Sequence, residues 1–340
     1  MLCVAPLSVQ AQEWVTPEFC DVSDIHLTEA QFADVLASVA ETGIDAPVNG
    51  HGRFWQITSP EGSVSHLWGT FHSSERRALD LPQAVEYAIE NARIIALESD
   101  HRARDRADLE RVYSYSDWWD DGLLPPTGLA LLAGADLRIQ GWIEERFAAI
   151  GYTPDTLPYF TQGAIANVLL GDPCEDLSLG VLPIQDNFIL TLAHVQDIEI
   201  VGLESSFAFF DTLNDPENRA LASAMITSYG AYLEPLEDRV ERAEWLTLYT
   251  SGEIGAMMVL DRAFTLEKLG PLGESALALR DGYLLETRNR NWLERIEPEL
   301  RKGNVFMAVG SFHLPGETGL VALLREAGFQ VSRVPVEGET

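Results

Sequence analysis

Two apolar runs that lie far apart in the chain end in almost the same four residues, Gly-x-Phe-His. The first run ends in residues 69–72 and the second in residues 310–313. Such short apolar runs are typical of buried β-strands, and Gly69 and Gly310 would let the chain turn sharply and let other groups approach closely. Ligands of α/β sheets bind beyond the carboxyl ends of the strands. The repeated motif therefore predicts that two strands present His72 and His313 at a sheet edge.

Two further strand-like runs end in a glutamate. Residues 93–98 and 198–204 are β-rich segments that finish at Glu98 and Glu204. A carboxylate inside a buried strand is costly to desolvate, so its place at the end of the run indicates an edge position. Two imidazoles and two carboxylates at one edge suit a hard or borderline divalent metal. Such a metal would lower the pKa of a bound water molecule. The simpler alternative is that each is an ordinary hydrogen-bonded or solvated residue at a strand end.

The order of the remaining segments predicts the fold class. Residues 54–58 and 64–71 flank a Ser-Pro-Glu-Gly turn and predict a β-hairpin, and residues 305–309 and 329–334 predict strands near the other end. Helical patterns occupy residues 28–40, 82–92, 186–195, 284–300 and 317–327. This order predicts an α/β sheet flanked by helices, with a helical insertion at about residues 102–300. We expect Trp118, Trp119 and Trp142 in that insertion to be core residues.

The N-terminal residues and the cysteines indicate export. Residues 1–11 are apolar and uncharged and end in a small-residue cleavage pattern, which is typical of the second half of a truncated secretory signal peptide. Cys3 would leave with that signal, and Cys20 and Cys174 would remain as a disulfide in an oxidising compartment. An ordinary N-terminus and two buried free thiols are the alternatives.

Charge and missing motifs narrow the function classes. The chain carries 53 Asp and Glu against 23 Lys and Arg, a formal net charge of -30, which would repel nucleic acid. It could attract cationic peptides or divalent metals, or only keep the protein soluble. No apolar run is long enough to predict a transmembrane segment. The motifs of common zinc sites, of serine-hydrolase nucleophile elbows and of nucleotide-binding loops are absent from the sequence.

Together these segments resemble the TraB/GumN family. The resemblance rests on LWGTFHSSE, the ALES and GLES strand ends, the run from Arg288 to Trp292, and AVGSFHLPGETGLVALLREAGFQV, and it covers about residues 50–335. The family includes the TIKI metalloproteases and is similar to erythromycin-esterase and ChaN-like folds. It implies one domain, which we place at residues 53–337 after a helical lead-in at residues 12–52. It also implies a mixed central sheet whose two Gly-x-x-His motifs line one cleft.

The resemblance implies a role for each candidate residue. His72 and His313 would hold a divalent metal with one of Glu98 or Glu204, and the other carboxylate would act as general base. The metal would be manganese or cobalt more readily than zinc. Arg288 matches a basic residue of the family that could stabilise an oxyanion or bind the substrate.

Other residues near the motifs receive lesser roles. Gly69 and Gly310 would be structural residues of the turns. Asp186 could orient a histidine ligand, although an exposed helix charge is the alternative. Glu75 stands where members often have Asp, and its longer side chain argues against a ligand role. His66, inside a predicted strand, is a rival candidate that we expect to be structural.

The leading hypothesis from the sequence is an exported metal-dependent hydrolase, a peptidase acting on a peptide or protein substrate in the periplasm or outside the cell. The alternative is a haem- or iron-binding protein, with His72 and His313 as axial ligands, or a non-catalytic cell-envelope protein of ChaN-like fold. The sequence makes no prediction of the oligomeric state.

Overall fold

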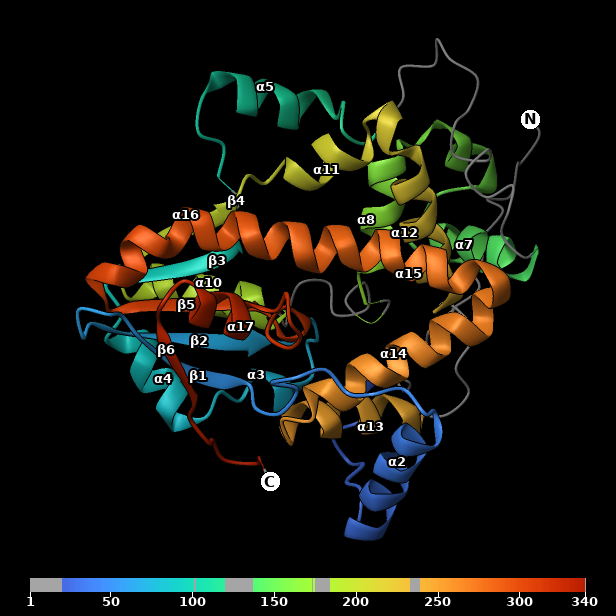
Figure 1. The fold of residues 1–340 in the computed structure, drawn as a ribbon. Helices are drawn as coiled ribbons and strands as arrows, with labels where there is room; N and C mark the ends of the chain where they lie inside the picture. Colours follow the sequence, from blue (N-terminus) through green and yellow to red (C-terminus); the bar gives the residue numbers. More distant parts are fainter. Residues whose placement is uncertain are drawn as a thin grey trace, which may run out of the picture.

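Helices cover both faces of a central β-sheet, and a helical insertion lies beside one edge of it (Figure 1). The structure is a computed structural model that describes residues 20–100, 102–119, 137–172, 174, 184–232 and 239–339. The signal peptide expected at residues 1–11 lies outside the described residues. No helix in these ranges is long and apolar enough to cross a membrane.

The sheet has six strands in the order β4-β3-β5-β2-β1-β6. The predicted hairpin is present, because β1 pairs antiparallel with β2. The neighbours among β4, β3, β5 and β2 are parallel, whereas β1 is antiparallel to both β2 and β6, so the mixed α/β fold is confirmed. The strands are β1 (Phe54–Thr58), β2 (Val64–Thr70), β3 (Ile94–Ser99), β4 (Glu199–Glu204), β5 (Val305–Gly310) and β6 (Gln330–Arg333).

Each face of the sheet has its own apolar core, because successive strand side chains point to opposite faces. Trp68 packs on one face and its neighbour Leu67 on the other, and both are fully buried. The Trp68 face is covered by α2 (Glu29–Glu41), α3 (Arg76–Leu79), α4 (Gln83–Glu90), α10 (Gln185–Val195), α13 (Arg239–Thr250) and α14 (Ile254–Leu269). The Leu67 face is covered by α16 (Arg288–Lys302) and α17 (Leu320–Glu326).

A third core belongs to the insertion. The described helices of the insertion are α5 (Arg106–Ser114), α7 (Leu137–Ala149), α8 (Gln162–Leu170), α11 (Ala208–Leu213), α12 (Arg219–Ala231) and α15 (Gly273–Asp281), with 3-10 turns at 154–159, 216–218 and 270–272. Of these, α7, α8, α11 and α12 contribute residues to the third core. The elements α10, β4, α13 and α14 also fall within residues 102–300 but belong to the sheet and its covering helices, so the insertion is not one continuous segment. Trp118 and Trp142 pack against this core as expected. Trp119 stacks on Phe160 with ring centroids 4.4 Å apart, yet 38% of it is exposed, so it lies at the border of the core.

One long helical segment joins the insertion to the sheet. In Figure 1, α15 and α16 follow one another as a single orange helix. Between them lies the π-helical turn η4 (Gly282–Thr287). π-Helical turns inside α-helices are rare and occur often at functional sites. Here the turn ends directly before Arg288, the first residue of α16.

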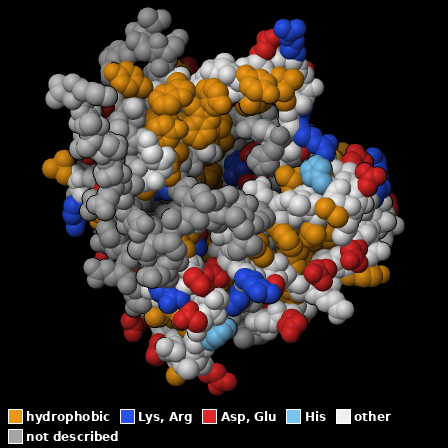
Figure 2. Space-filling model, turned by 180° about the vertical axis from the view of Figure 1, so that it is seen from behind, with side chains coloured by type: hydrophobic (Ala, Val, Ile, Leu, Met, Phe, Trp, Pro, Cys, Tyr) orange, Lys and Arg blue, Asp and Glu red, His pale blue; other side chains and the backbone are white. Residues whose placement is uncertain are grey.

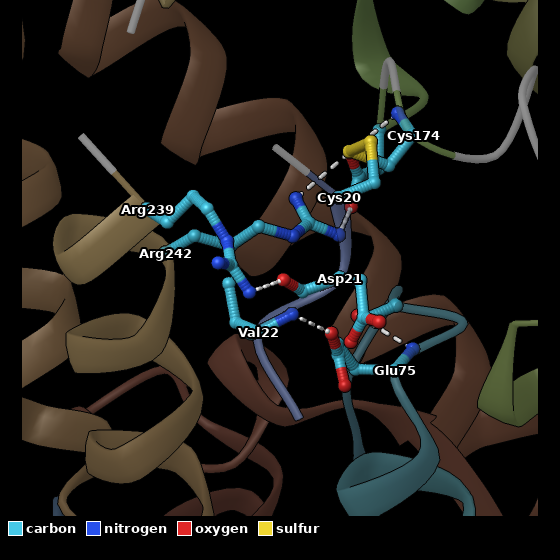
Figure 3. Close-up of a disulfide and its surroundings, with 9 residues drawn as sticks. Cys20, Asp21, Val22, Glu75, Cys174, Arg239 and Arg242 are labelled. Carbon is cyan, nitrogen blue, oxygen red and sulfur yellow. Dashed lines mark hydrogen bonds and ion pairs between the residues drawn. A yellow bond between two sulfur atoms is a disulfide. The ribbon is translucent and has the colours of Figure 1, made fainter. Parts of the chain in front are cut away.

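A disulfide joins the lead-in to the insertion. Cys20 and Cys174 are bonded, with Cα atoms 5.5 Å apart, which confirms the predicted pair. Figure 3 shows that the residues after Cys20 reach the turn that follows β2, where the Val22 amide donates to Glu75 Oε1 at 2.9 Å. Glu75 therefore anchors the lead-in. Its carboxylate is engaged in this contact, which is consistent with the expectation that Glu75 is not a metal ligand.

Candidate metal centre

The parallel strands bring the predicted site residues to one edge of the sheet. Glu98 lies near the end of β3 and Glu204 ends β4, while His72 and His313 follow β2 and β5. These four residues line one cavity of about 580 Å³ together with Arg288 and Asp186. The space-filling view in Figure 2 shows a hollow near the middle of the molecule, with charged side chains inside it and hydrophobic side chains beside it.

One group in this cavity has the spacing of metal ligands. Within the part of the chain that the structure describes, His72, Glu98 and Asp186 each offer one ligand atom, and these atoms lie within 4.8 Å of one another. Asp186 comes from the first turn of α10, where Thr70 Oγ1 donates to its Oδ1 at 2.9 Å. His72 Nε2 is 3.5 Å from Asp186 Oδ2. The structure thus places Asp186, expected as an outer partner, among the candidate ligands.

The Glu98 carboxylate is held in its ionised form. Its Oε1 accepts the Gly310 amide at 2.8 Å and its Oε2 accepts Arg288 Nη2 at 2.7 Å. Burial raises the pKa of Glu98, but the charge of Arg288, the nearby histidines and the Gly310 amide lower it by more, to about 2. The side chain therefore carries a full negative charge into the cavity at neutral pH.

Glu204 faces a cation rather than the candidate ligands. Its carboxylate accepts Arg288 Nη2 at 2.7 Å and Arg288 Nε at 3.2 Å, and Trp292 Nε1 donates to it at 3.1 Å. The Arg288 guanidinium also lies over the Trp292 ring, 4.5 Å from its centroid. Arg288 thus bridges both predicted glutamates, as a fork of donors on a planar cation allows.

His313 is buried beside this ion-pair cluster and its tautomer is determined by Asn289. The Asn289 amide nitrogen donates to the carbonyls of His313 and Thr318, so its Oδ1 faces His313 Nδ1, at 2.7 Å, as an acceptor. His313 therefore carries its proton on Nδ1, and the Nε2 lone pair lies 3.7 Å from Glu98 Oε1. Burial lowers the pKa of His313 to about 3, which keeps the imidazole neutral.

Gly310 lies between the side chains of His72 and His313. A Cβ atom at this position would lie 3.3 Å from Glu98 Oε1, 3.5 Å from His313 Cδ2 and 3.8 Å from His72 Nε2. A side chain here would occupy the space between the candidate ligands. A Cβ at Gly69 would lie 3.1 Å from the Ser311 backbone, so the first motif needs its glycine for close packing of the two turns.

Two observations on this site fit a cation. Asp186 Oδ2 is buried and has no hydrogen-bond partner, and burial raises the pKa of Asp186 above its ordinary value. The His313 Nε2 lone pair lies 3.7 Å from Glu98 Oε1, and a cation beside these two electron-rich atoms would be stabilised by both. Neutral imidazole and carboxylate oxygens are the donors that divalent transition metals such as manganese and cobalt accept.

Sequence reasoning missed some residues that shape the site. Asn289 and Trp292 lie in the quoted run that begins at Arg288, so that run carried a signal for them. For Gln185 the sequence carried no signal except its position next to Asp186. The rival His66 lies inside β2 and stacks on Phe54 with ring centroids 5.3 Å apart, as a structural residue would.

Comparison with known proteins identifies the family. The model of the TraB/PrgY/gumN family matches residues 53–333, which include all six strands and both Gly-x-Phe-His motifs. Among curated proteins and among solved structures, no match was found. The family match covers well over half of the chain and confirms the resemblance that the sequence motifs predicted. The chain belongs to the TraB/PrgY/gumN family.

Proposed function

We propose that this protein is an exported metal-dependent hydrolase that cleaves peptide bonds. The observation that carries the proposal is the group formed by His72, Glu98 and Asp186, whose ligand atoms lie within 4.8 Å of one another in the cavity at the carboxyl edge of the sheet. A divalent metal held there, manganese or cobalt before zinc, would polarise a substrate carbonyl and lower the pKa of water. The neutral His313 imidazole, beside Glu98, would complete the donor set.

The other charged residues would divide the remaining work. Arg288 pairs with Glu98 and Glu204, and its positive charge at the cavity wall would stabilise negative charge that develops on a substrate carbonyl oxygen. Glu204 lines the same cavity outside the ligand group, which suits the general base. Because its carboxylate already accepts N–H groups, taking up a proton would weaken its pairing with Arg288.

Two features support export. The Cys20–Cys174 disulfide is of the kind that persists in oxidising compartments such as the periplasm. The apolar residues 1–11 have the composition of the end of a signal peptide. Fusion of the first 30 residues to a reporter that is active only outside the cytoplasm would test the location.

Metal binding and turnover are tested on the same purified protein. We expect Mn²⁺ or Co²⁺ to bind in calorimetric titration, and we expect the loaded protein to cleave members of a quenched fluorescent peptide library. His72→Ala and Glu98→Gln should abolish both. His194→Ala, which changes an exposed histidine in the last turn of α10, is the matched control and should change neither.

Two outcomes would contradict the proposal. Equal metal affinity in His72→Ala, Glu98→Gln and the unsubstituted protein would show that His72 and Glu98 do not bind a metal. A Soret band on addition of haem, without uptake of Mn²⁺ or Co²⁺, would instead favour the haem-binding alternative. Glu204→Gln separates the assigned roles, because loss of a general base lowers kcat while metal affinity stays near its original value.

A further inference from the structure

A buried glutamine directly before Asp186 links the elements that carry His72 and Asp186. Gln185 is the first residue of α10 and is 1% exposed. Its side-chain amide contacts groups from β2 and its following turn, from α3 and from α13. A fully buried amide with partners in this many elements has little freedom to move.

The contacts on both ends of the amide fix its orientation. Gln185 Oε1 accepts Trp68 Nε1 at 3.0 Å and the Phe71 amide at 3.2 Å. Gln185 Nε2 donates to the Ala78 carbonyl. Rotation by half a turn would set the NH₂ group against two N–H donors and the carbonyl against another carbonyl, so only one orientation satisfies every partner.

Tyr249 adds a contact to the same oxygen. Its hydroxyl lies 2.8 Å from Gln185 Oε1 and 2.9 Å from the Gly69 carbonyl, and its single proton is shared between these acceptors. The Tyr249 ring stacks on Phe71 with centroids 4.8 Å apart. Phe71, the residue before His72, is thus held through its backbone by Gln185 and through its ring by Tyr249.

We propose that Gln185 is a positioning residue that sets the spacing between His72 and Asp186. The turn that carries His72 begins at Phe71 and leads into α3, which holds Ala78, so the Gln185 amide fixes the backbone at both ends of that turn. Asp186 follows Gln185 directly in α10. This inference rests on the metal site proposed above and adds to it a residue that touches no candidate ligand side chain.

The test compares two buried glutamines, each the first residue of a helix. Gln185→Met keeps side-chain length but removes the hydrogen bonds. Gln162→Met makes the same change at the first residue of α8, where the side chain is also buried, at 7% exposure, in the insertion. Titration with Co²⁺ followed by visible absorption reports both affinity and ligand geometry. We expect Gln185→Met to weaken Co²⁺ binding by about 10-fold and to change the shape of the absorption band. Gln162→Met should change neither.

A conservative variant separates positioning from simple loss of a buried polar group. Burial would keep the carboxyl of Gln185→Glu protonated, so its O–H could donate to Ala78 and its carbonyl could accept from Phe71. We expect this variant to restore the affinity and the band shape of the unsubstituted protein. A folded Gln185→Met protein with unchanged affinity and spectrum would overturn the inference.

Folding failure does not remove the test. If Gln185→Met does not fold, Tyr249→Phe deletes one hydroxyl contact to the same oxygen, and an unchanged Co²⁺ spectrum in that variant would count against positioning. An unsubstituted protein that takes up no Co²⁺ would overturn the metal site and this inference together. Equal uptake by unsubstituted protein and Gln185→Met would overturn the inference alone.

Discussion

The two halves of the site differ in how completely their polar groups are satisfied. In the ion-pair half, Arg288 donates to Glu98 and Glu204 at 2.7 Å each, and Glu204 also accepts Trp292. In the ligand half, His72 and Asp186 approach only to 3.5 Å, and Asp186 Oδ2 has no hydrogen-bond partner. The charged groups of the ion-pair half satisfy one another, so they can hold their side chains in place without a metal. The second has room and charge for a cation, so it should contribute little to the stability of the metal-free protein.

The largest expected effect comes from breaking the ion-pair half. Arg288→Met leaves two largely buried carboxylates, each 18% exposed, without their cation, and we expect the free energy of unfolding of the metal-free protein to fall by about 3–5 kcal/mol. Arg290→Met, an exposed change on the same helix, is the matched control and should have a much smaller effect. Urea unfolding measures both. Equal effects of the two substitutions would show that the ion pairs do not stabilise the fold.

Loss of stability from outside the site should leave metal binding intact. Replacing both Cys20 and Cys174 by Ala removes a bridge between residues 154 positions apart, which should lower the free energy of unfolding by about 2–4 kcal/mol. We expect the affinity for Mn²⁺ to stay unchanged under conditions where this variant is folded. A parallel loss of affinity would mean that stability and ligand geometry are not separable in this protein.

The ligand half should show the opposite pattern. Asp186→Asn removes a carboxylate whose pKa burial raises, so the metal-free protein should keep its melting temperature or gain a little. Metal affinity should fall about 100-fold, or about 2.7 kcal/mol, because a charged ligand is lost. Thermal unfolding measures the stability of the metal-free variant and calorimetry measures its metal affinity. A large drop in metal-free stability would show that Asp186 is a structural residue instead.

The smallest effect, for a change of one pH unit, is a pH dependence of stability from His313. Its pKa in the folded protein is about 3 against an ordinary 6.5, so as the pH falls below 6.5 only the unfolded chain binds the proton. Stability is then lost by about 1.4 kcal/mol per pH unit. The lowered pKa of Glu98 adds its own loss only below 4.5. Melting temperatures of the metal-free protein between pH 6.5 and 4.5 should therefore fall less steeply in His313→Gln, and identical slopes would contradict the assignment.

The sequence by itself determined the strands, an α/β sheet flanked by helices and the edge at which the motifs meet, whereas the mixed sheet was implied by the family resemblance and the Cys20–Cys174 pair was one of two alternatives. Apolar runs end at residues whose burial is costly, and parallel strands bring those ends to one side, so His72, His313, Glu98 and Glu204 could be placed from local patterns. The predicted boundaries are within a few residues of the observed ones, as between 93–98 and β3.

Only the tertiary structure decided how those side chains divide into two halves. Arg288 reaches Glu98 and Glu204 across separations of 190 and 84 residues, and Asp186 meets Thr70 across 116. No periodicity in the sequence encodes such contacts, because they depend on how α10 and α16 pack against the sheet. Burial then assigns the chemistry, since desolvation and the nearest charge together fix whether each group carries a proton.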